Sequence, residues 1–225
     1  MPRSCGPAPT GMPNFVATTT PSRLPLSARP QISSDWRYPS AGWVRQVEQL
    51  IELDARLAKV LKGETAPANA HERLQLAFFC QRYKTLYAAS AAWYVEAFAA
   101  EPKAADDLQA AHRYNAARAA ALASSGKGHD AGKLNDDERT RLRRQALGWL
   151  RADLATYAKQ LPAANAHDRT MLQKQMERWR RDDDLIALRD AAALARLADD
   201  EREAWQQLWA EVETLLRATR GAKKE

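Results

Sequence analysis

The chain has 225 residues, with 34 Lys and Arg against 28 Asp and Glu, and its formal net charge of +6 is spread along the sequence. No apolar run approaches the roughly 20 residues needed to cross a bilayer, which excludes a membrane-spanning protein. The two cysteines, Cys5 and Cys80, are too few for a disulfide framework or a four-ligand zinc site, so a reducing compartment, the cytoplasm, is expected.

Residues 1–40 are expected to form a disordered or loosely packed extension rich in Pro, Ser and Thr. Eight of the 11 prolines lie before residue 40, and proline breaks helices because it lacks a backbone donor. The best apolar stretch there, 15–17, is too short for a secretory signal. The Ser- and Arg-rich composition resembles organelle transit peptides, but the prolines argue against their amphipathic helix. We expect an inert extension, then a helical domain over 41–220 and a charged tail over 221–225.

From Gly42 onward the apolar residues recur at helical spacing. The first predicted helix spans 43–61, and one apolar stripe along it contains Val44, Val47, Ile51, Leu57 and Leu61. Asn69 and Glu72 form a capping-box pattern that begins a second helix, over about 70–83. A third helix is predicted over 87–100. Pro102 suits the first turn of a fourth, which continues through Ala-rich sequence to Ser124.

The second half of the body begins after a break at Gly126, Gly128 and Gly132. Asn135 and Glu138 form another capping-box pattern, which starts a helix that reaches about Gln160. The remaining helices are predicted over 168–180, over 190–197 and from about 200 onward. The three aspartates at 182–184 are interpreted as a solvated turn. No stretch alternates apolar and polar residues with enrichment in β-branched residues, which would indicate a strand. The predicted fold is therefore all-α, with about eight helices.

One segment fits the tetratricopeptide pattern, in which pairs of helices repeat and stack. The second helix of that pattern needs a small residue, an aromatic residue, alanine and proline at fixed spacings. This sequence has those residue types at those spacings, in Ser90, Tyr94, Ala97 and Pro102. The first helix of this unit fits loosely, and a second unit can be traced over 114–150. The sequence therefore predicts a tetratricopeptide-like solenoid of helical hairpins.

Four segments carry a further resemblance: 113–117 (Arg-Tyr-Asn-Ala-Ala), 143–154, 184–190 and 201–209. Through them the chain from about Trp43 to Leu216 resembles the tetratricopeptide-like region at the carboxyl end of large bacterial serine/threonine protein kinases, especially those of planctomycetes. The resemblance implies a non-catalytic scaffold for protein–protein interaction in kinase-linked signalling. The alternative is the regulatory carboxyl-terminal fragment of a split or truncated kinase.

The sequence lacks the motifs of a kinase catalytic domain. It has no glycine-rich phosphate loop, no Val-Ala-Ile-Lys-like strand and no Asp-Phe-Gly. His112-Arg113-Tyr114-Asn115 echoes a catalytic loop, but it lacks the aspartate and lies in a predicted helix. We therefore expect no kinase activity from this chain.

No other pattern indicates an enzyme, a metal site or a cofactor site. The four histidines, His71, His112, His129 and His167, have no metal-ligand spacing. Cys80 lies on a helix face that should be buried, which favours a packed thiol over a nucleophile. The consecutive carboxylates do not converge on one helix face, so capping and solvation explain them better than acid–base chemistry.

The tryptophans and arginines each allow two interpretations. Trp149, Trp179, Trp205 and Trp209 match the apolar stripes, so core packing is favoured over an aromatic binding platform. Trp36 and Trp43 are expected to attach the extension to the body.

The densest arginine clusters lie over 139–144 and 178–181. Nucleic acid is an unlikely partner for them, because aspartates at 136–137 and 182–184 cancel much of their field.

The strongest functional expectation is a peptide groove. In tetratricopeptide arrays the first helix of each pair lines a concave face, and in adaptors that capture acidic chain ends an Asn and basic residues hold the terminal carboxylate. By this resemblance the groove residues are His71, Arg82, Tyr114, Asn115 and Arg118. Charge-assisted bonds from arginine suit an acidic peptide or an acidic partner protein. Leu74 stands where those adaptors carry Lys, and interhelical packing is the alternative role of Asn115.

Overall fold

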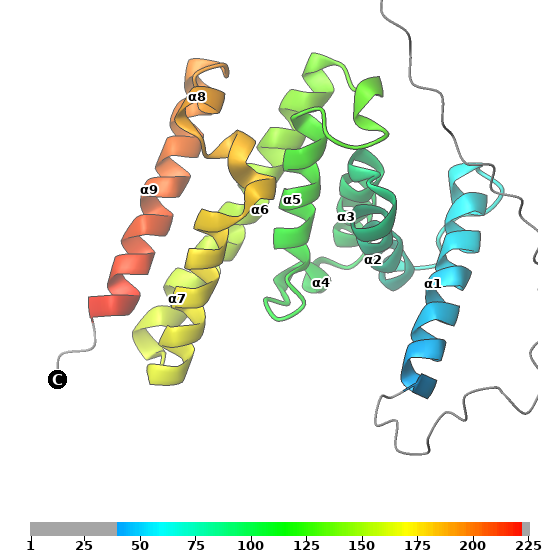
Figure 1. Ribbon diagram of the computed structural model, residues 1–225. Coiled ribbons are helices and arrows are strands. Elements are labelled where there is room, and N and C mark those ends of the chain that lie inside the picture. Colours follow the sequence, from blue (N-terminus) through cyan, green and yellow to red (C-terminus); the bar gives the residue numbers. More distant parts are fainter. Residues whose placement is uncertain (1–39, 222–225) are drawn as a thin grey trace, which may run out of the picture. The chain divides into compact units, whose positions relative to one another are not determined.

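A computed structural model describes residues 40–221, with side chains from residue 42 to residue 220 (Figure 1). The extension predicted over 1–40 and the tail predicted over 221–225 therefore lie almost wholly outside the described residues. The chain divides into two compact units, Met1–Arg45 and Gln46–Glu225, and the packing described below belongs to the second. Residues 40–221 contain helices and connecting segments and no strand, which confirms the all-α prediction.

Nine α-helices occur in the described part of the chain. Their bounds are α1 Ser40–Leu61, α2 Ala70–Phe79, α3 Tyr87–Ala100, α4 Pro102–Asp106, α5 His112–Ser124, α6 Asp136–Gln160, α7 Ala166–Arg181, α8 Ala191–Leu194 and α9 Asp199–Gly221. A π-helical turn, η2 (Cys80–Lys84), continues α2, and the short 3₁₀ helices are η3 (Ala131–Lys133), η4 (Leu161–Ala163) and η5 (Asp183–Leu188). No helix among these residues is long and apolar enough to cross a membrane.

Asparagine caps begin three of these helices. Asn135 makes the predicted capping box, because its side chain accepts from the Glu138 backbone at 2.9 Å while the Glu138 carboxylate accepts from the Asn135 backbone at 2.8 Å. Asn69 caps α2 in the same way, but the Glu72 carboxylate accepts instead from the Ala68 backbone at 2.6 Å. Asn165 caps α7, a cap that sequence inspection did not identify.

The fourth predicted helix, over 102–124, is wrong as a single element. The chain leaves α4 at Asp107, whose carboxylate accepts from the backbone of Gln109 and Ala110 at 2.9 and 3.0 Å. Ala111 then takes a left-handed conformation, with φ of 53°, before α5 begins. This local turn competes successfully with the helix propensity of the alanines on either side.

The stripe predicted along α1 is also displaced. Leu57 is buried, but Val44, Val47, Ile51 and Leu61 are exposed. The residues of α1 that pack against the core are Leu50, Leu53, Leu57 and Val60, which lie on an adjacent face. The periodicity was correct for a helix, but it selected the wrong face.

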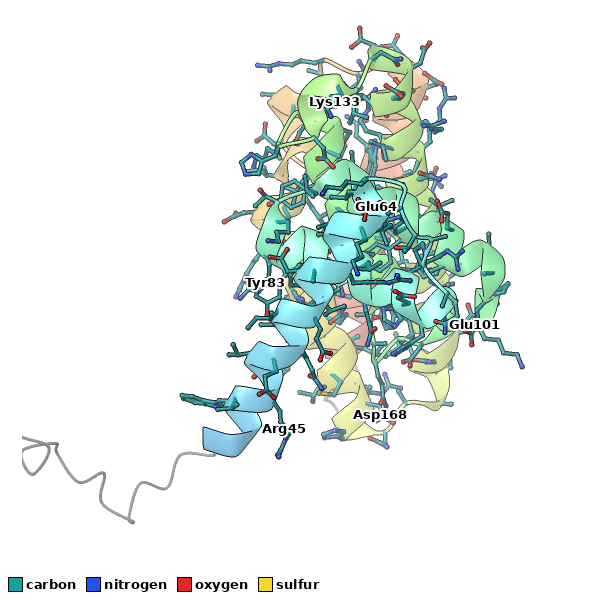
Figure 2. The ribbon with its side chains drawn as sticks, turned by 90° about the vertical axis from the view of Figure 1, so that its right-hand side faces the viewer. Arg45, Glu64, Tyr83, Glu101, Lys133 and Asp168 are labelled. Carbon is teal, nitrogen blue, oxygen red and sulfur yellow. The ribbon has the colours of Figure 1, made fainter. Side chains whose placement is uncertain are left out.

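Antiparallel helix pairs follow one another through the second unit. The helices α2, α5 and α7 run in one direction and α3, α6 and α9 in the opposite one (Figure 1). Lys133, between α5 and α6, accordingly lies at the opposite end of the unit from Asp168, near the start of α7 (Figure 2). Contacts join α2 to α3, α5 to α6 and α7 to α9, and α3 to α5 and α6 to α9 between the pairs.

Small side chains allow α5 to lie in the middle of this unit. Its alanines at 116, 117, 119, 120, 121 and 123 have no exposed surface, and the helix contacts α3, α6 and η5. In the first pair Tyr94 and Ala97 are buried, and the Ser90 hydroxyl donates to the Ala77 carbonyl at 2.8 Å. Alanine and serine at these positions let neighbouring backbones approach closely.

The core tryptophans confirm the packing interpretation. Trp179 and Trp205 are fully buried, and Trp149 and Trp209 are partly buried against the core. Trp149 also contacts a second apolar cluster, formed mainly by α1, α2 and α3, through an edge-on contact with Phe98 at a centroid distance of 5.9 Å. Trp36 lies outside the described residues, and Trp43 is exposed.

Candidate functional site

The described residues contain no group of three His, Cys, Asp or Glu side chains that could hold a metal ion. Cys80 has no exposed surface, and its burial raises the pKa of the thiol to about 12. A thiol with that pKa stays protonated at neutral pH, as expected for a packed side chain.

One hollow lies between the turn that precedes α5, the end of α6 and the length of α7. We call it the α5–α7 groove; its volume is about 720 Å³. Its lining includes Leu108, Gln109, Ala111, Tyr157, Gln160, Ala163, Ala164, Asp168, Met171, Leu172, Gln175 and Arg178. Leu172 and Tyr157 give it an apolar floor, and exposed Met171 and Arg178 lie at its surface.

Two of the helices with the same direction carry stripes with the same spacing. On α2 and its π-helical turn the stripe is His71, Gln75, Phe78 and Arg82, and on α7 it is Met171, Gln175, Arg178 and Asp182. Spacings of four and three residues keep the first three residues of each set on one helix face, while Arg82 follows in the π-helical turn and Asp182 directly after α7. Asn115 and Arg118 occupy corresponding positions on α5, where the Asn115 backbone donates to the carbonyl of the groove residue Ala111 at 3.0 Å.

An ion-pair cluster joins α5 to the end of α7 and the start of η5; it comprises Tyr114, Arg118, Asp182 and Asp184. The Tyr114 hydroxyl donates to the Asp182 carboxylate, and Arg118 Nη2 donates to the Asp184 carboxylate. Arg118 Nε lies 3.0 Å from Asp182 Oδ2, although the geometry is not that of a hydrogen bond. The turn predicted as solvated is thus partly buried and paired, because Arg118 attracts two of its three carboxylates.

Burial and the two carboxylates together set the pKa values of this cluster. It raises the pKa of the Tyr114 hydroxyl, and the neighbouring Asp182 carboxylate raises it further. Burial alone would lower the pKa of Arg118, but Asp182 and Asp184 outweigh it and raise that pKa. Tyr114 is therefore a neutral donor and Arg118 a permanent cation.

Arg178 is the cation of the groove that remains open. Its guanidinium carbon lies 4.8 Å from the centroid of the Tyr114 ring, which is itself stacked on Trp179 at 5.7 Å with an interplanar angle of 4°. No carboxylate among the described residues forms an ion pair with Arg178, and the side chain is exposed. The edge of the groove therefore carries an exposed cation held over an aromatic ring.

The five groove residues named from the sequence have different environments. Tyr114 and Arg118 meet, but both are engaged in the cluster, and Tyr114 has no exposed surface. Asn115 is half-buried, and its side chain makes no hydrogen bond with a described residue. His71 and Arg82 are exposed on α2 and its π-helical turn. The pKa of His112, at the start of α5, is lowered by burial, which outweighs the opposing effect of the Asp107 carboxylate.

Sequence inspection missed the α7 side of this surface. Met171, Gln175 and Arg178 carry it, and the available signal was their spacing, which repeats that of His71, Gln75 and Phe78. The arginine clusters, by contrast, include internal contacts. Arg139 donates to three backbone carbonyls, those of Ser124, Ala131 and Leu134. Arg143 and Arg180 form ion pairs with Glu201 and Glu213.

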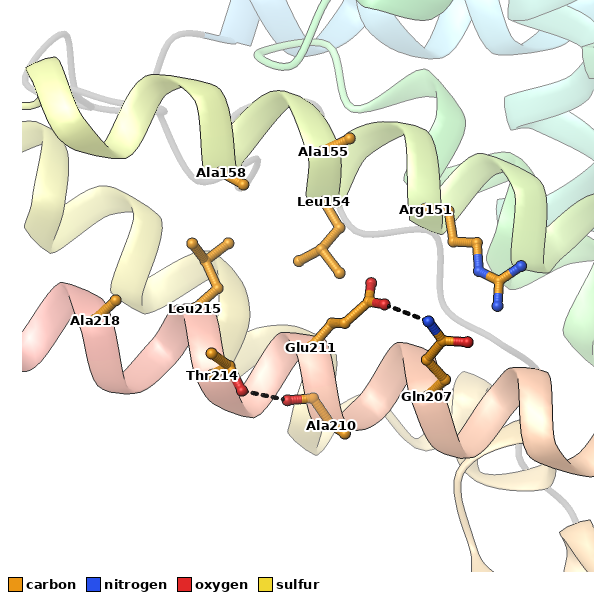
Figure 3. A pocket seen from close by; sticks show the side chains of 10 residues that line it. All are labelled: Arg151, Leu154, Ala155, Ala158, Gln207, Ala210, Glu211, Thr214, Leu215 and Ala218. Atoms are coloured by element: carbon orange, nitrogen blue, oxygen red, sulfur yellow. Dashed lines mark hydrogen bonds between the residues drawn. The ribbon is translucent and has the colours of Figure 1, made fainter.

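A second hollow, of about 430 Å³, lies between α6 and α9 (Figure 3). Leu154 and Leu215 project into it, and alanines line much of the rest. Several of its polar groups are already paired: Gln207 donates to Glu211 at 2.9 Å, Thr214 to the Ala210 carbonyl at 2.9 Å and Arg151 to the Ala204 carbonyl at 3.2 Å. The α5–α7 groove, with Arg178 open, is the better candidate for recognition.

Comparison with known proteins gives no relative for this chain. No protein-family model matches the sequence, and no curated protein or solved structure matches it.

Proposed function

We propose that the protein is a non-catalytic, tetratricopeptide-like scaffold that binds an acidic peptide or partner protein in the α5–α7 groove. The single observation that carries this proposal is Arg178, an exposed guanidinium without a carboxylate partner among the described residues, held over Tyr114 beside an apolar groove. Ligand sites of this kind combine an apolar floor with a few oriented polar groups.

The helix arrangement supports the scaffold part of the proposal. Three antiparallel pairs, α2/α3, α5/α6 and α7/α9, follow one another, and the first contains the pattern residues Ser90, Tyr94 and Ala97 at buried positions. In a solenoid each pair buries its apolar faces against its neighbours, which leaves one helix of each pair to line a continuous surface. The matching stripes of α2 and α7, with Asn115 and Arg118 between them, fit such a surface.

The biological setting in this proposal rests on the sequence resemblance. A serine/threonine kinase or its substrate is the expected partner, and the cytoplasm is the expected compartment. Recognition without turnover is the mechanism: the groove takes an apolar side chain, and Arg178 forms a charge-assisted bond with a neighbouring carboxylate.

Selection from a displayed library of random peptides tests the function. Peptides selected on the wild-type protein should be enriched in acidic residues next to an apolar residue. Arg178→Glu should weaken their binding roughly tenfold or more, because it places a carboxylate where the ligand carboxylate binds. Arg181→Glu is the matched control, since Arg181 is exposed on the same helix but does not line the groove. Equal losses in the two variants would contradict the proposal.

A further inference from the structure

We infer that Asp184 regulates the proposed site as an internal acidic ligand, which occupies Arg118 until a carboxylate of the partner displaces it. This inference rests on the proposed function, because it assumes that acidic partners bind along the face formed by α5 and α7. It adds a second cation, Arg118, that becomes available only on exchange.

The geometry at Arg118 is that of an occupied anion site. Asp182 and Asp184 approach the same edge of the guanidinium, one at Nε and the other at Nη2. A single carboxylate can fill that edge with two parallel hydrogen bonds. Here two carboxylates share it, and the buried Nε donor is left without an aligned acceptor. Because Asp182 lies 3.0 Å from Nε, a partner carboxylate that displaces Asp184 would take the Nη2 donor.

The charges explain why the internal ligand matters. Arg118 and Arg178 both lie against the Tyr114 ring, at 5.8 and 4.8 Å from its centroid, and Asp182 and Asp184 supply two opposing charges. The formal charges of the four groups sum to zero, but both aspartates lie on Arg118, so only Arg178 of the two cations is open to an acidic partner while these contacts hold. Removing the Asp184 charge leaves the cluster with a net positive charge beside the groove.

Asp184 can release Arg118 without unfolding its segment. The backbone of η5 is fixed by Leu185 and Leu188, which are buried, and by the Asp182 side chain, which accepts from the Asp184 backbone at 3.0 Å. The Asp182 carbonyl also accepts from Arg189 at 2.9 Å. The Asp184 side chain, in contrast, is 31% exposed and can rotate into solvent. Exchange therefore requires a change of side-chain rotamer only.

Two adjacent aspartates provide a charge-matched test. Asp184→Asn and Asp183→Asn change the net charge equally, but Asp183 is exposed and forms no ion pair with a described residue. The probe is fluorescein-labelled hexaglutamate, titrated by fluorescence anisotropy at low salt. Asp184→Asn should bind it roughly three- to tenfold more tightly than Asp183→Asn does. Adding Arg118→Gln to Asp184→Asn should remove this gain.

Equal affinities of the two asparagine variants, or a gain that survives Arg118→Gln, would overturn the inference. Failure of Asp184→Asn to bind hexaglutamate would also overturn the inference, because it would show that the released Arg118 guanidinium does not attract carboxylates. Each of these results leaves the proposed function standing if library peptides still depend on Arg178. If the binding of library peptides does not depend on Arg178, the proposed function is wrong, whatever the hexaglutamate titrations show.

Discussion

At the scale of single residues, the most connected side chain of the candidate site is Tyr114. It stacks on Trp179, supports Arg178 and donates to Asp182, although it has no exposed surface. From the sequence, Tyr114 and Arg118 were expected to meet a partner. Their actual contacts depend on Asp182 and Asp184, more than 60 residues away, and helical periodicity carries no information about such long-range pairing.

The hydroxyl of Tyr114 should stabilise the fold. Tyr114→Phe removes a hydrogen bond to a carboxylate and leaves Asp182 with one donor fewer, so the free energy of unfolding should fall by about 1–2 kcal/mol. Urea denaturation measures the change. Tyr83→Phe, at an exposed tyrosine, is the control. Similar values for the two variants would show that the contact with Asp182 contributes nothing to stability.

At the scale of elements, local sequence signals predicted where most helices lie, whereas long-range contacts determine which of their faces and turns are buried. The capping pattern at Asn135 and the bounds 87–100 were predicted correctly because they depend on neighbours within one turn. The break before α5 depends on an equally local turn at Asp107, which the alanine-rich composition obscured. The exposed face of α1 and the burial of Asp182 could not be read from periodicity, since both depend on which element packs against them.

The junction of α1 with α2 should weaken at acid pH. The pKa of Glu72 is lowered by its hydrogen bond with Arg56, at 2.5 Å, and by the bond from the Ala68 backbone. Because the folded pKa lies below the unfolded one, near 4.3, the ionised carboxylate stabilises the fold above that pH and this contribution disappears as the pH falls further.

Glu72→Gln should therefore lower the free energy of unfolding by about 1 kcal/mol or less at neutral pH, because the pair is partly exposed. The difference from wild type should shrink below about pH 4. Urea denaturation across this pH range measures it, with Glu64→Gln at an exposed glutamate as control. A difference that stays constant down to pH 3 would show that the Glu72 charge is not involved.

At the scale of the whole molecule, the proposed function places the partner on one face of the second unit, beside α5 and α7. Much of its polar surface can serve a partner: Arg178 has no carboxylate partner, and Asn115 makes no side-chain hydrogen bond, among the described residues. The groove that Arg178 lines has an apolar floor and a volume of about 720 Å³. The proposed function requires that a peptide occupies this groove.

Methionine methyl resonances test that claim most directly. Met171 is exposed in the groove and Met176 is fully buried on the same helix, so the pair provides a reporter and an internal reference. With isotope-labelled methionine methyl groups, assigned through Met171→Leu, titration of a library-selected peptide should shift the Met171 signal and leave that of Met176 nearly unchanged. A peptide that binds without shifting Met171, or whose shift survives Arg178→Glu, would contradict a partner site in the α5–α7 groove.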